Sequence, residues 1–350
     1  MIDDHVRIRS CRVDSYDLPL NPPWVTSRGQ LSHRQGWLVF LATDGEVAGC
    51  GECAPMEQAG TESHAEAGQS LHRWAGRVAG MRLSKLWQLL DDEAISPAVR
   101  CALEGAVVDL AARRQRQPLA HLLNPAAPLD VAVNAAVGSA DQGLVGRATR
   151  ATRDGYKVLK IKVGVGPAED EIGSLRACAE RLAPGVTMRL DANGAWDMAA
   201  ARVWMRELEG LPIDTVEEPL AGMDPDELRQ LQQEVDWSLA ADESLIPLIG
   251  ISGPAGLPVR RVVIKPMVVG GVRPSLRLAT QAGDCEVVVT TTLEAAPGRW
   301  LTAHLAAALD DGFAHGLDTG RWLSADVGPG PVIWRGRCRL ADPDRLPSSG

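Results

Sequence analysis

Hydrophobic and polar positions alternate along much of the first 55 residues, which is typical of β-strands. The pattern covers His5–Ser15 and Gln35–Thr43, and Asp44-Gly45 is a hairpin signal before a third run at Glu46–Gly51. Between the first two strands, Asp17–His33 is rich in Pro, Asn, Ser and Gly. We therefore expect a mobile loop over that segment.

From residue 62 to residue 123 the period changes to that of amphipathic helices. Ser63–Val78 and Pro97–Arg114 carry apolar residues at helical spacing. The first third of the chain is therefore predicted to be a mixed α+β unit. The segment Pro125–Pro128 is a plausible boundary at its end.

After Asp130, short apolar runs alternate with amphipathic stretches. The runs are Val131–Val137, Val158–Val163, Thr187–Asp191, Asp214–Glu218, Ser238–Asp242, Arg261–Lys265, Glu286–Thr290 and Ala314–Leu317. The helical stretches include Pro167–Leu182, Ala199–Leu208, Pro225–Val235, Gly271–Gly283 and Arg299–Leu309. Repeated βα units indicate a parallel sheet, and eight of them indicate a closed α/β barrel. We expect the division 1–125, 126–325 and 326–350, with the last segment returning to the first unit.

Composition and charge argue against some classes of partner. The 350 residues are 45% hydrophobic with a net charge of −9, and the sequence contains no dense basic run, which argues against a nucleic-acid partner. The polar N-terminus differs from a signal peptide, and no apolar run is long enough to span a bilayer. We expect a cytoplasmic protein with a small-molecule partner and no membrane partner. The sequence does not determine the oligomeric state.

The seven cysteines do not suggest a metal centre. Cys50 and Cys53 form a C-x-x-C pair, but no second pair completes a zinc site. We expect both to be small buried residues.

Two lysines stand in the second apolar run. Lys160 and Lys162 are separated by one residue, so on a strand both side chains point to the same face. Crowding of two ammonium groups, together with burial, lowers a lysine pKa and favours a general base. Taken alone, the segment fits an exposed edge strand with two solvated lysines equally well.

Acidic residues end the next three runs. Asp191, Glu217 and Asp242 each close a run one βα unit after the last, and Lys265 ends the run that follows. Because strand ends meet at one rim of a barrel, we expect the four side chains and the lysine pair to converge. Any one of the acids could simply cap a helix. Three consecutive acids, however, indicate an oxygen-ligated Mg²⁺ site, in which Mn²⁺ can substitute.

This combination of motifs resembles the enolase superfamily, and within it the muconate-lactonizing subgroup. The resemblance covers nearly the whole chain and implies a (β/α)7β-type TIM barrel with an α+β capping domain, completed by the C-terminal tail. It implies that Lys162 is the general base and that Lys160 lowers its pKa. It also implies that Asp191, Glu217 and Asp242 bind Mg²⁺ and that Lys265 is the catalytic lysine opposite. No histidine stands at the sixth or seventh strand end, so a histidine base is disfavoured. His304 lies inside a predicted helix, and we expect it to be a packing or surface residue.

Two loop segments suggest a substrate class. Dipeptide epimerases carry Asp-x-Asp at the eighth strand, whereas this chain has Gly316-Leu317-Asp318-Thr319-Gly320, without the first Asp. This segment and Thr290–Gly298 resemble the o-succinylbenzoate synthases. That resemblance implies a Mg²⁺-dependent syn dehydration of a succinyl-cyclohexadiene carboxylate in menaquinone biosynthesis. An N-succinylamino-acid racemase on the same site is a competing hypothesis.

Further residues are candidates for substrate contacts. They are Asn193 beside the metal acids, Thr291 and Thr292, the pair Gly270-Gly271, and Arg28 in the first loop. For Arg189, packing behind the acids and contact with a bound water or carboxylate are equally consistent with the sequence. Glu243 is a candidate partner of Lys265. The sequence also fits two further hypotheses, a Schiff-base aldolase that uses Lys265 and a non-catalytic binding or structural protein. The intact set of lysines and acids argues against the second of these.

Overall fold

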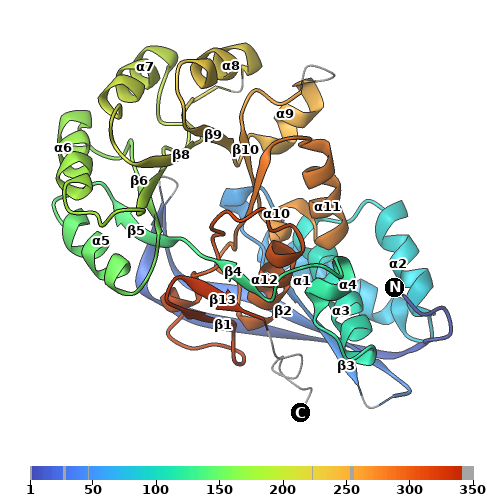
Figure 1. Cartoon of the computed structure of the whole chain (residues 1–350). Coiled ribbons are helices and arrows are strands. Elements are labelled where there is room, and N and C mark those ends of the chain that lie inside the picture. The colour runs from blue at the N-terminus through green and yellow to red at the C-terminus, as the bar shows by residue number, and fades with distance from the viewer. Residues whose placement is uncertain (1, 27–28, 46, 223, 253–255, 341–350) are drawn as a thin grey trace.

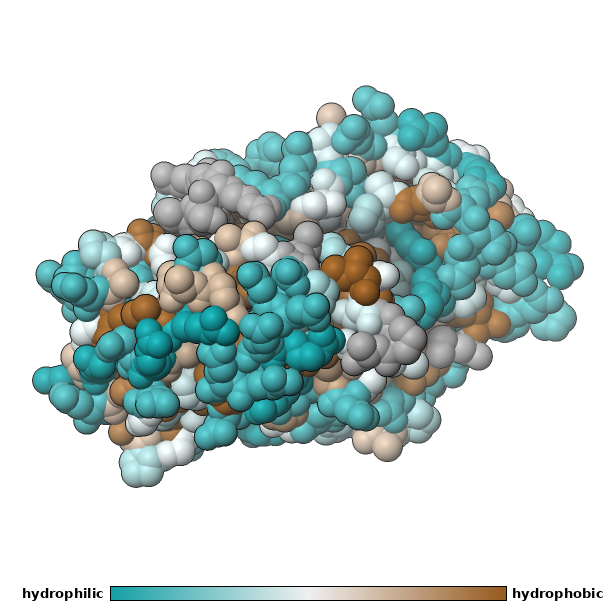
Figure 2. All heavy atoms as spheres, turned by 90° about the horizontal axis from the view of Figure 1, so that it is seen from above, coloured by the Kyte–Doolittle hydropathy of each residue, from teal (hydrophilic) through white to brown (hydrophobic). Residues whose placement is uncertain are grey.

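The structure of the chain, a computed structural model, describes residues 2–26, 29–45, 47–222, 224–252 and 256–340. An antiparallel sheet and four helices come first, followed by a seven-stranded parallel sheet with its helices and a small three-stranded sheet (Figure 1). Figure 2 shows one face, where hydrophobic residues form small patches among hydrophilic ones. No helix in the described ranges is both long and apolar enough to span a bilayer.

The N-terminal sheet has the strand order β1-β2-β3 and is antiparallel. Its strands are β1 (Ile8–Thr26), β2 (Gly29–Thr43) and β3 (Ala48–Cys53). The predicted hairpin at Asp44-Gly45 is confirmed, although Glu46 lies outside the described residues. The helical elements that follow are η1 (Glu57–Ala59), α1 (His64–Val78), α2 (Leu83–Asp92), α3 (Pro97–Arg114) and α4 (Leu119–Leu123). Both predicted helices of this region are confirmed.

The prediction of a mobile loop over Asp17–His33 is wrong for the described residues. Most of this segment continues β1 and β2, where Leu18 pairs with Arg34 and the ladder is interrupted only between Pro19 and Trp24. Proline is tolerated because β1 is an edge strand, where a missing N–H breaks no second ladder. Burial of Leu18 against the sheet outweighs the loop-like composition.

Helix α3 packs tightly on this sheet. Almost all of its residues from Ala98 to Ala112 are buried, so it has no hydrophilic face along most of its length. Glycine makes the close approach to β3 possible, because a Cβ on Gly51 would lie 1.9 Å from the carbonyl oxygen of Ala102. On its other side, α3 contacts the helices that follow β10 and β11.

The parallel sheet runs in the order β11-β10-β9-β8-β7-β6-β5. Its strands are β5 (Ala135–Ser139), β6 (Val158–Lys162), β7 (Thr187–Asp191), β8 (Ile213–Glu217), β9 (Ser238–Ala241), β10 (Arg261–Ile264) and β11 (Glu286–Val289). The helices between and after them are α5 (Leu144–Arg153), α6 (Ala168–Ala179), α7 (Met198–Glu207), α8 (Pro225–Gln233), α9 (Leu245–Ser252), α10 (Pro266–Val269), α11 (Val272–Gln281) and α12 (Ala296–Ala308). In Figure 1, α5 to α8 lie outside the arc of strands. The helical stretches predicted here are confirmed.

The first and last predicted runs depart from regular strands. Val131–Val137 splits into β4 (Asp130–Ala132), which joins another sheet, and β5. Ala314–Leu317 forms only isolated parallel bridges, from His315 to Val133 and from Gly316 to Thr290. These bridges reach the chain next to both edge strands, so this short segment links the two edges of the sheet.

The C-terminal strands complete the small sheet. β12 (Val332–Trp334) and β13 (Arg337–Arg339) form a hairpin, and β13 pairs with β4 of the middle unit. Just before them, Leu323 bridges Leu20 of β1, and the Ser324 N–H donates to the Pro19 carbonyl at 2.9 Å. The segment from residue 323 to residue 339 therefore contacts both β1 and β4, and the division at residues 125 and 325 stays a prediction.

Candidate active site

Three predicted site residues stand side by side at the carboxyl ends of adjacent strands. Lys162 of β6 is in register with Asp191 of β7, and Asp191 is in register with Glu217 of β8. On β6, Leu159 and Ile161 are fully buried whereas the two lysines are half-buried, as expected for side chains on opposite faces. The prediction that Lys160 and Lys162 share a face is confirmed.

The ammonium groups lie among the carboxylates. Nζ of Lys160 donates to Oε2 of Glu217 and lies 3.1 Å from Oδ2 of Asp191. Nζ of Lys162 lies 3.6 Å from the same Asp191 oxygen. Nζ of Lys265 donates to Oδ2 of Asp242 at 2.5 Å. The structure thus brings together all six residues that the strand-end argument selected.

A cavity of about 610 Å³ opens over this cluster. Its lining includes the three lysines together with Asp191, Asp242, Asn193, Thr291 and Thr292. Glu217 is 1% exposed and is not among the described lining residues, but it accepts a hydrogen bond from Lys160, which is. The volume suits a small organic substrate.

Two other candidates lie elsewhere. Gly270 and Gly271 are not among the described residues that line the cavity. Instead they turn the chain toward α3, where a Cβ on Gly271 would meet Glu104 at 2.6 Å. The structure therefore gives these two glycines no contact with the cavity. Arg28 lies outside the described residues.

The cavity has walls that the sequence argument missed. The loop after β3 contributes Met56, Gln58 and Ala59, and the segment after residue 317 contributes Thr319 and Trp322. Ser139 also lines it, at the end of β5. The strand-end rule applied to the first run would have found Ser139. No comparable rule points to the loop from the N-terminal sheet.

The pKa values of two site lysines differ from those expected for a crowded lysine pair. Burial lowers the pKa of Lys160, but the charges of Asp191 and Glu217 outweigh burial and raise it above the ordinary range. Burial likewise lowers the pKa of Lys265, and Asp242 more than compensates. The expected lowering is therefore wrong for Lys160, because carboxylates surround it. A Schiff-base lysine must lose its proton, so the pairing with Asp242 also disfavours an aldolase.

The donor set fits a divalent cation. Oδ1 of Asp191 is buried and has no hydrogen-bond partner, although buried carboxylate oxygens are normally satisfied. Asp191, Glu217 and Asp242 are all nearly inaccessible, and each carboxylate contacts an ammonium group. In the described ranges no three acidic, histidine or cysteine side chains form a ready metal cage, because Lys160 stands between two of the acids. Three carboxylate ligands match the oxygen preference of Mg²⁺.

Neighbouring polar residues support this cluster. Nδ2 of Asn193 donates to Oε1 of Glu243 at 3.3 Å, and Oδ1 of Asn193 accepts from Nζ of Lys162 at 2.5 Å. Arg189 is 1% exposed and lies beneath the cavity, where its Nε donates to Oδ2 of Asp214 at 2.9 Å. Arg189 therefore packs below the site, whereas Asn193 orients Lys162.

The single acid of the Gly-Leu-Asp-Thr-Gly segment is already paired. Oδ2 of Asp318 accepts from the hydroxyl of Tyr156 at 2.5 Å and lies 2.5 Å from Nη2 of Arg321. A carboxylate with two such partners has little remaining charge for a substrate ammonium group.

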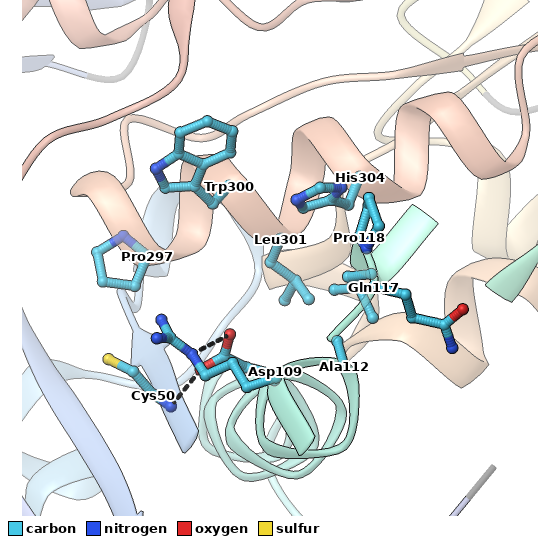
Figure 3. A pocket seen from close by; sticks show the side chains of 12 residues that line it. Cys50, Asp109, Ala112, Gln117, Pro118, Pro297, Trp300, Leu301 and His304 are labelled. Atoms are coloured by element: carbon cyan, nitrogen blue, oxygen red, sulfur yellow. Dashed lines mark hydrogen bonds and ion pairs between the residues drawn. The ribbon is translucent and has the colours of Figure 1, made fainter. Parts of the chain in front are cut away.

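A second, much smaller cavity lies between α3 and α12 (Figure 3). Its volume of about 30 Å³ is close to that of one water molecule. It contains His304, whose pKa burial lowers to about 4, and the buried pair of Asp109 with Arg113. Cys50 lines it as a buried free thiol, and Cys53 is also buried and free, as expected. His304 is therefore a neutral packing residue, in agreement with the sequence prediction.

The chain is similar to proteins that catalyse several reactions. An o-succinylbenzoate synthase of Thermobifida fusca is 36% identical over 186 residues, which cover 51% of this chain and 57% of the relative. An N-succinyl-L-Arg/Lys racemase of Bacillus cereus is 27% identical over 294 residues, covering 81% and 79%. The solved structure of a dipeptide epimerase from Methylococcus capsulatus, complexed with Mg and L-Arg-D-Lys, is 25% identical. It superposes with a TM-score of 0.87 and covers 96% of this chain and 98% of that one.

Two family models match the sequence. One is described as MenC, N-terminal domain, and matches residues 8–106. The other, described as Enolase C-terminal domain-like, matches residues 143–344, which is more than half of the chain. The chain therefore belongs to the enolase superfamily.

Proposed function

We propose that this protein is an o-succinylbenzoate synthase. In this reaction, 2-succinyl-6-hydroxy-2,4-cyclohexadiene-1-carboxylate loses water to give 2-succinylbenzoate, a step of menaquinone biosynthesis. The observation that carries the proposal is the register of Lys162, Asp191 and Glu217 across three adjacent strands. The match of the N-terminal region to the MenC model supports the choice of substrate.

Asp191, Glu217 and Asp242 would hold the metal, Mg²⁺ with Mn²⁺ as a substitute. When bound, the metal neutralises the negative charge that develops on the substrate carboxylate as the α-proton leaves. The unpartnered Oδ1 of Asp191 is the atom that most needs such a cation. The same ion would neutralise the charges of Asp191 and Glu217, and so weaken their attraction for the Lys160 ammonium group.

The lysines move the proton and hold the anion. Lys162 takes the α-proton as the general base, and Asn193, which contacts its Nζ at 2.5 Å, fixes its position. The resulting ammonium group returns this proton to the leaving hydroxyl, which departs as water. Lys265, which follows β10, is separated from β6 by three intervening strands and faces the developing anion from the other side.

A second candidate is an N-succinylamino-acid racemase. The placement of Lys162 and Lys265 on separate parts of the rim favours it, because one lysine removes the α-proton and the other supplies one to the opposite face. Neither candidate has a substrate with a free ammonium group, so neither needs an unpaired carboxylate to bind one. This agrees with the pairing of Asp318 with Tyr156 and Arg321.

We also propose that the bridged sheet is a (β/α)7β barrel with an N-terminal capping domain.

The test is turnover of the cyclohexadiene substrate with Mg²⁺, with a chelator and with Lys162→Ala. Rapid formation of 2-succinylbenzoate that stops with the chelator and with the variant supports the dehydratase. Absence of turnover, together with deuterium exchange at Cα of N-succinyl amino acids, would assign the site to racemisation instead. Absence of both reactions would refute both candidates.

A further inference from the structure

Two loops from distant parts of the chain both line the cavity. One follows β3 and contributes Met56, Gln58 and Ala59 to the lining. The other follows β11 and contributes Thr291, Thr292 and Leu293. Together they form part of the cavity wall.

Arg34 of β2 is hydrogen-bonded to both loops. Its Nε donates to the carbonyl oxygen of Leu293 at 3.0 Å. Its Nη1 donates to the carbonyl oxygen of Pro55 at 2.7 Å, and its Nη2 donates to that of Ala54. The side chain is buried, with 3% of the residue exposed. Only a planar guanidinium group offers donors in several fixed directions, so a lysine cannot make the same bridge.

The loop after β11 needs such support. Leu293 has φ of 65°, a left-handed conformation that is unfavourable for leucine and persists only where the surroundings impose it. The carbonyl of this residue is the one that Arg34 holds. Just beyond, the N–H groups of Ala295 and Gly298 donate to Glu52 of β3 at 2.7 and 2.8 Å, so the C-terminal part of the loop is held from the same sheet at a second point.

We propose that Arg34 is a positioning residue that sets substrate affinity by joining the two loops. It lines no described part of the cavity and contacts none of the three lysines or metal acids. Its effect therefore falls on the part of the substrate beyond the reacting carboxylate. This inference rests on the proposed function in taking the cavity as the active site.

The test compares Arg34→Met and Arg34→Lys with Arg9→Met, which removes an exposed arginine from the neighbouring strand. With the cyclohexadiene carboxylate, or with N-succinyl amino acids if only these react, we expect KM to rise about tenfold in both Arg34 variants. We expect kcat to stay within about threefold and Arg9→Met to match the wild type. Because Lys keeps the charge but loses the bridge, a wild-type KM in Arg34→Lys would overturn the proposal.

Chemical rescue and hydrogen exchange complete the test. Guanidinium ions at millimolar concentration should lower the KM of Arg34→Ala, and ethylammonium should not. Backbone amides in 54–61 and 291–295 should exchange faster in Arg34→Lys, with no change in α6 to α8. If the wild type turns over neither substrate, the proposed function fails. Hydrogen exchange alone then tests whether Arg34 joins the two loops. Unchanged exchange in both loops would then refute it.

Discussion

Lys160 of β6 donates a hydrogen bond to Glu217 of β8, across the intervening strand that carries Asp191. The ammonium group thus stands where the two carboxylates would otherwise repel each other. A divalent cation bound by these carboxylates would compete with Lys160 for the same oxygens, so metal binding and the protonation of this lysine would be linked.

Asp191→Asn should weaken metal binding. The substitution removes one anionic charge beside the buried Oδ1, which has no partner. We expect the affinity for Mn²⁺, measured by electron paramagnetic resonance of the free ion, to fall by at least about 100-fold. Asp226→Asn changes an exposed carboxylate and should leave the affinity unaltered. Equal affinities in Asp191→Asn and the wild type would exclude Asp191 as a ligand.

Lys265→Met should impair the chemistry on one face of the substrate and leave proton exchange on the other face intact. We expect kcat for dehydration to fall by about 100- to 1,000-fold, because one stabilising charge is lost. In deuterated water, this variant should still exchange Cα of one enantiomer of an N-succinyl amino acid through Lys162. Exchange of both enantiomers at wild-type rates would contradict the assignment. The exposed Lys157 provides the control, Lys157→Met.

Glu52→Gln should change how stability depends on pH. Burial and the charge of Glu294 raise the pKa of Glu52 to about 7, against the hydrogen bond from Tyr16. The folded form binds this proton more tightly than the unfolded form, so the contribution of Glu52 to stability is fully present below pH 4.5 and is lost as the pH rises to about 7. The stability of the wild type relative to Glu52→Gln should decrease by up to about 3 kcal/mol over this interval.

Urea unfolding followed by tryptophan fluorescence at several pH values measures this difference. Glu209→Gln replaces an exposed carboxylate and should keep the pH dependence of the wild type. A constant difference between wild type and Glu52→Gln from pH 4.5 to 7 would show that Glu52 does not titrate there.

Gly51→Ala should destabilise the protein. The new methyl group would lie 1.9 Å from the carbonyl oxygen of Ala102, so β3 and α3 must move apart. We expect a loss of about 1–3 kcal/mol in the free energy of unfolding. Gly76→Ala, in α1, meets no atom within 4 Å and should stabilise by about 0.5–1 kcal/mol. Equal effects of the two substitutions would contradict the packing described here.

Sequence periodicity predicted the parts of this molecule where local and tertiary preferences agree. The helix Pro97–Arg114 and the strand Thr187–Asp191 have the predicted bounds, because one pattern of burial runs through each. Asp191, Glu217 and Asp242 were found because regular βα spacing converts sequence positions into one rim. Asp17–His33 was mistaken for a loop because its strand pairing depends on a partner segment and on its place at a sheet edge.

The walls of the cavity were harder to predict than its floor. Met56 and Trp322 reach the cavity through contacts between separate units, which no local pattern encodes. The pKa of Lys160 was misjudged for a related reason. Its neighbour in sequence is another lysine, whereas its neighbours in space are carboxylates on two other strands.

The bridges made by His315 and Gly316 have a consequence for synthesis of the chain. The edges at β5 and β11 stay unjoined until this segment, near the end of the sequence, has left the ribosome. A nascent chain that pauses after β11 therefore exposes two open strand edges and the cluster of lysines and acids between them. Such a paused chain is an expected client of chaperones, although the three lysines and three acids of the cluster have already been made.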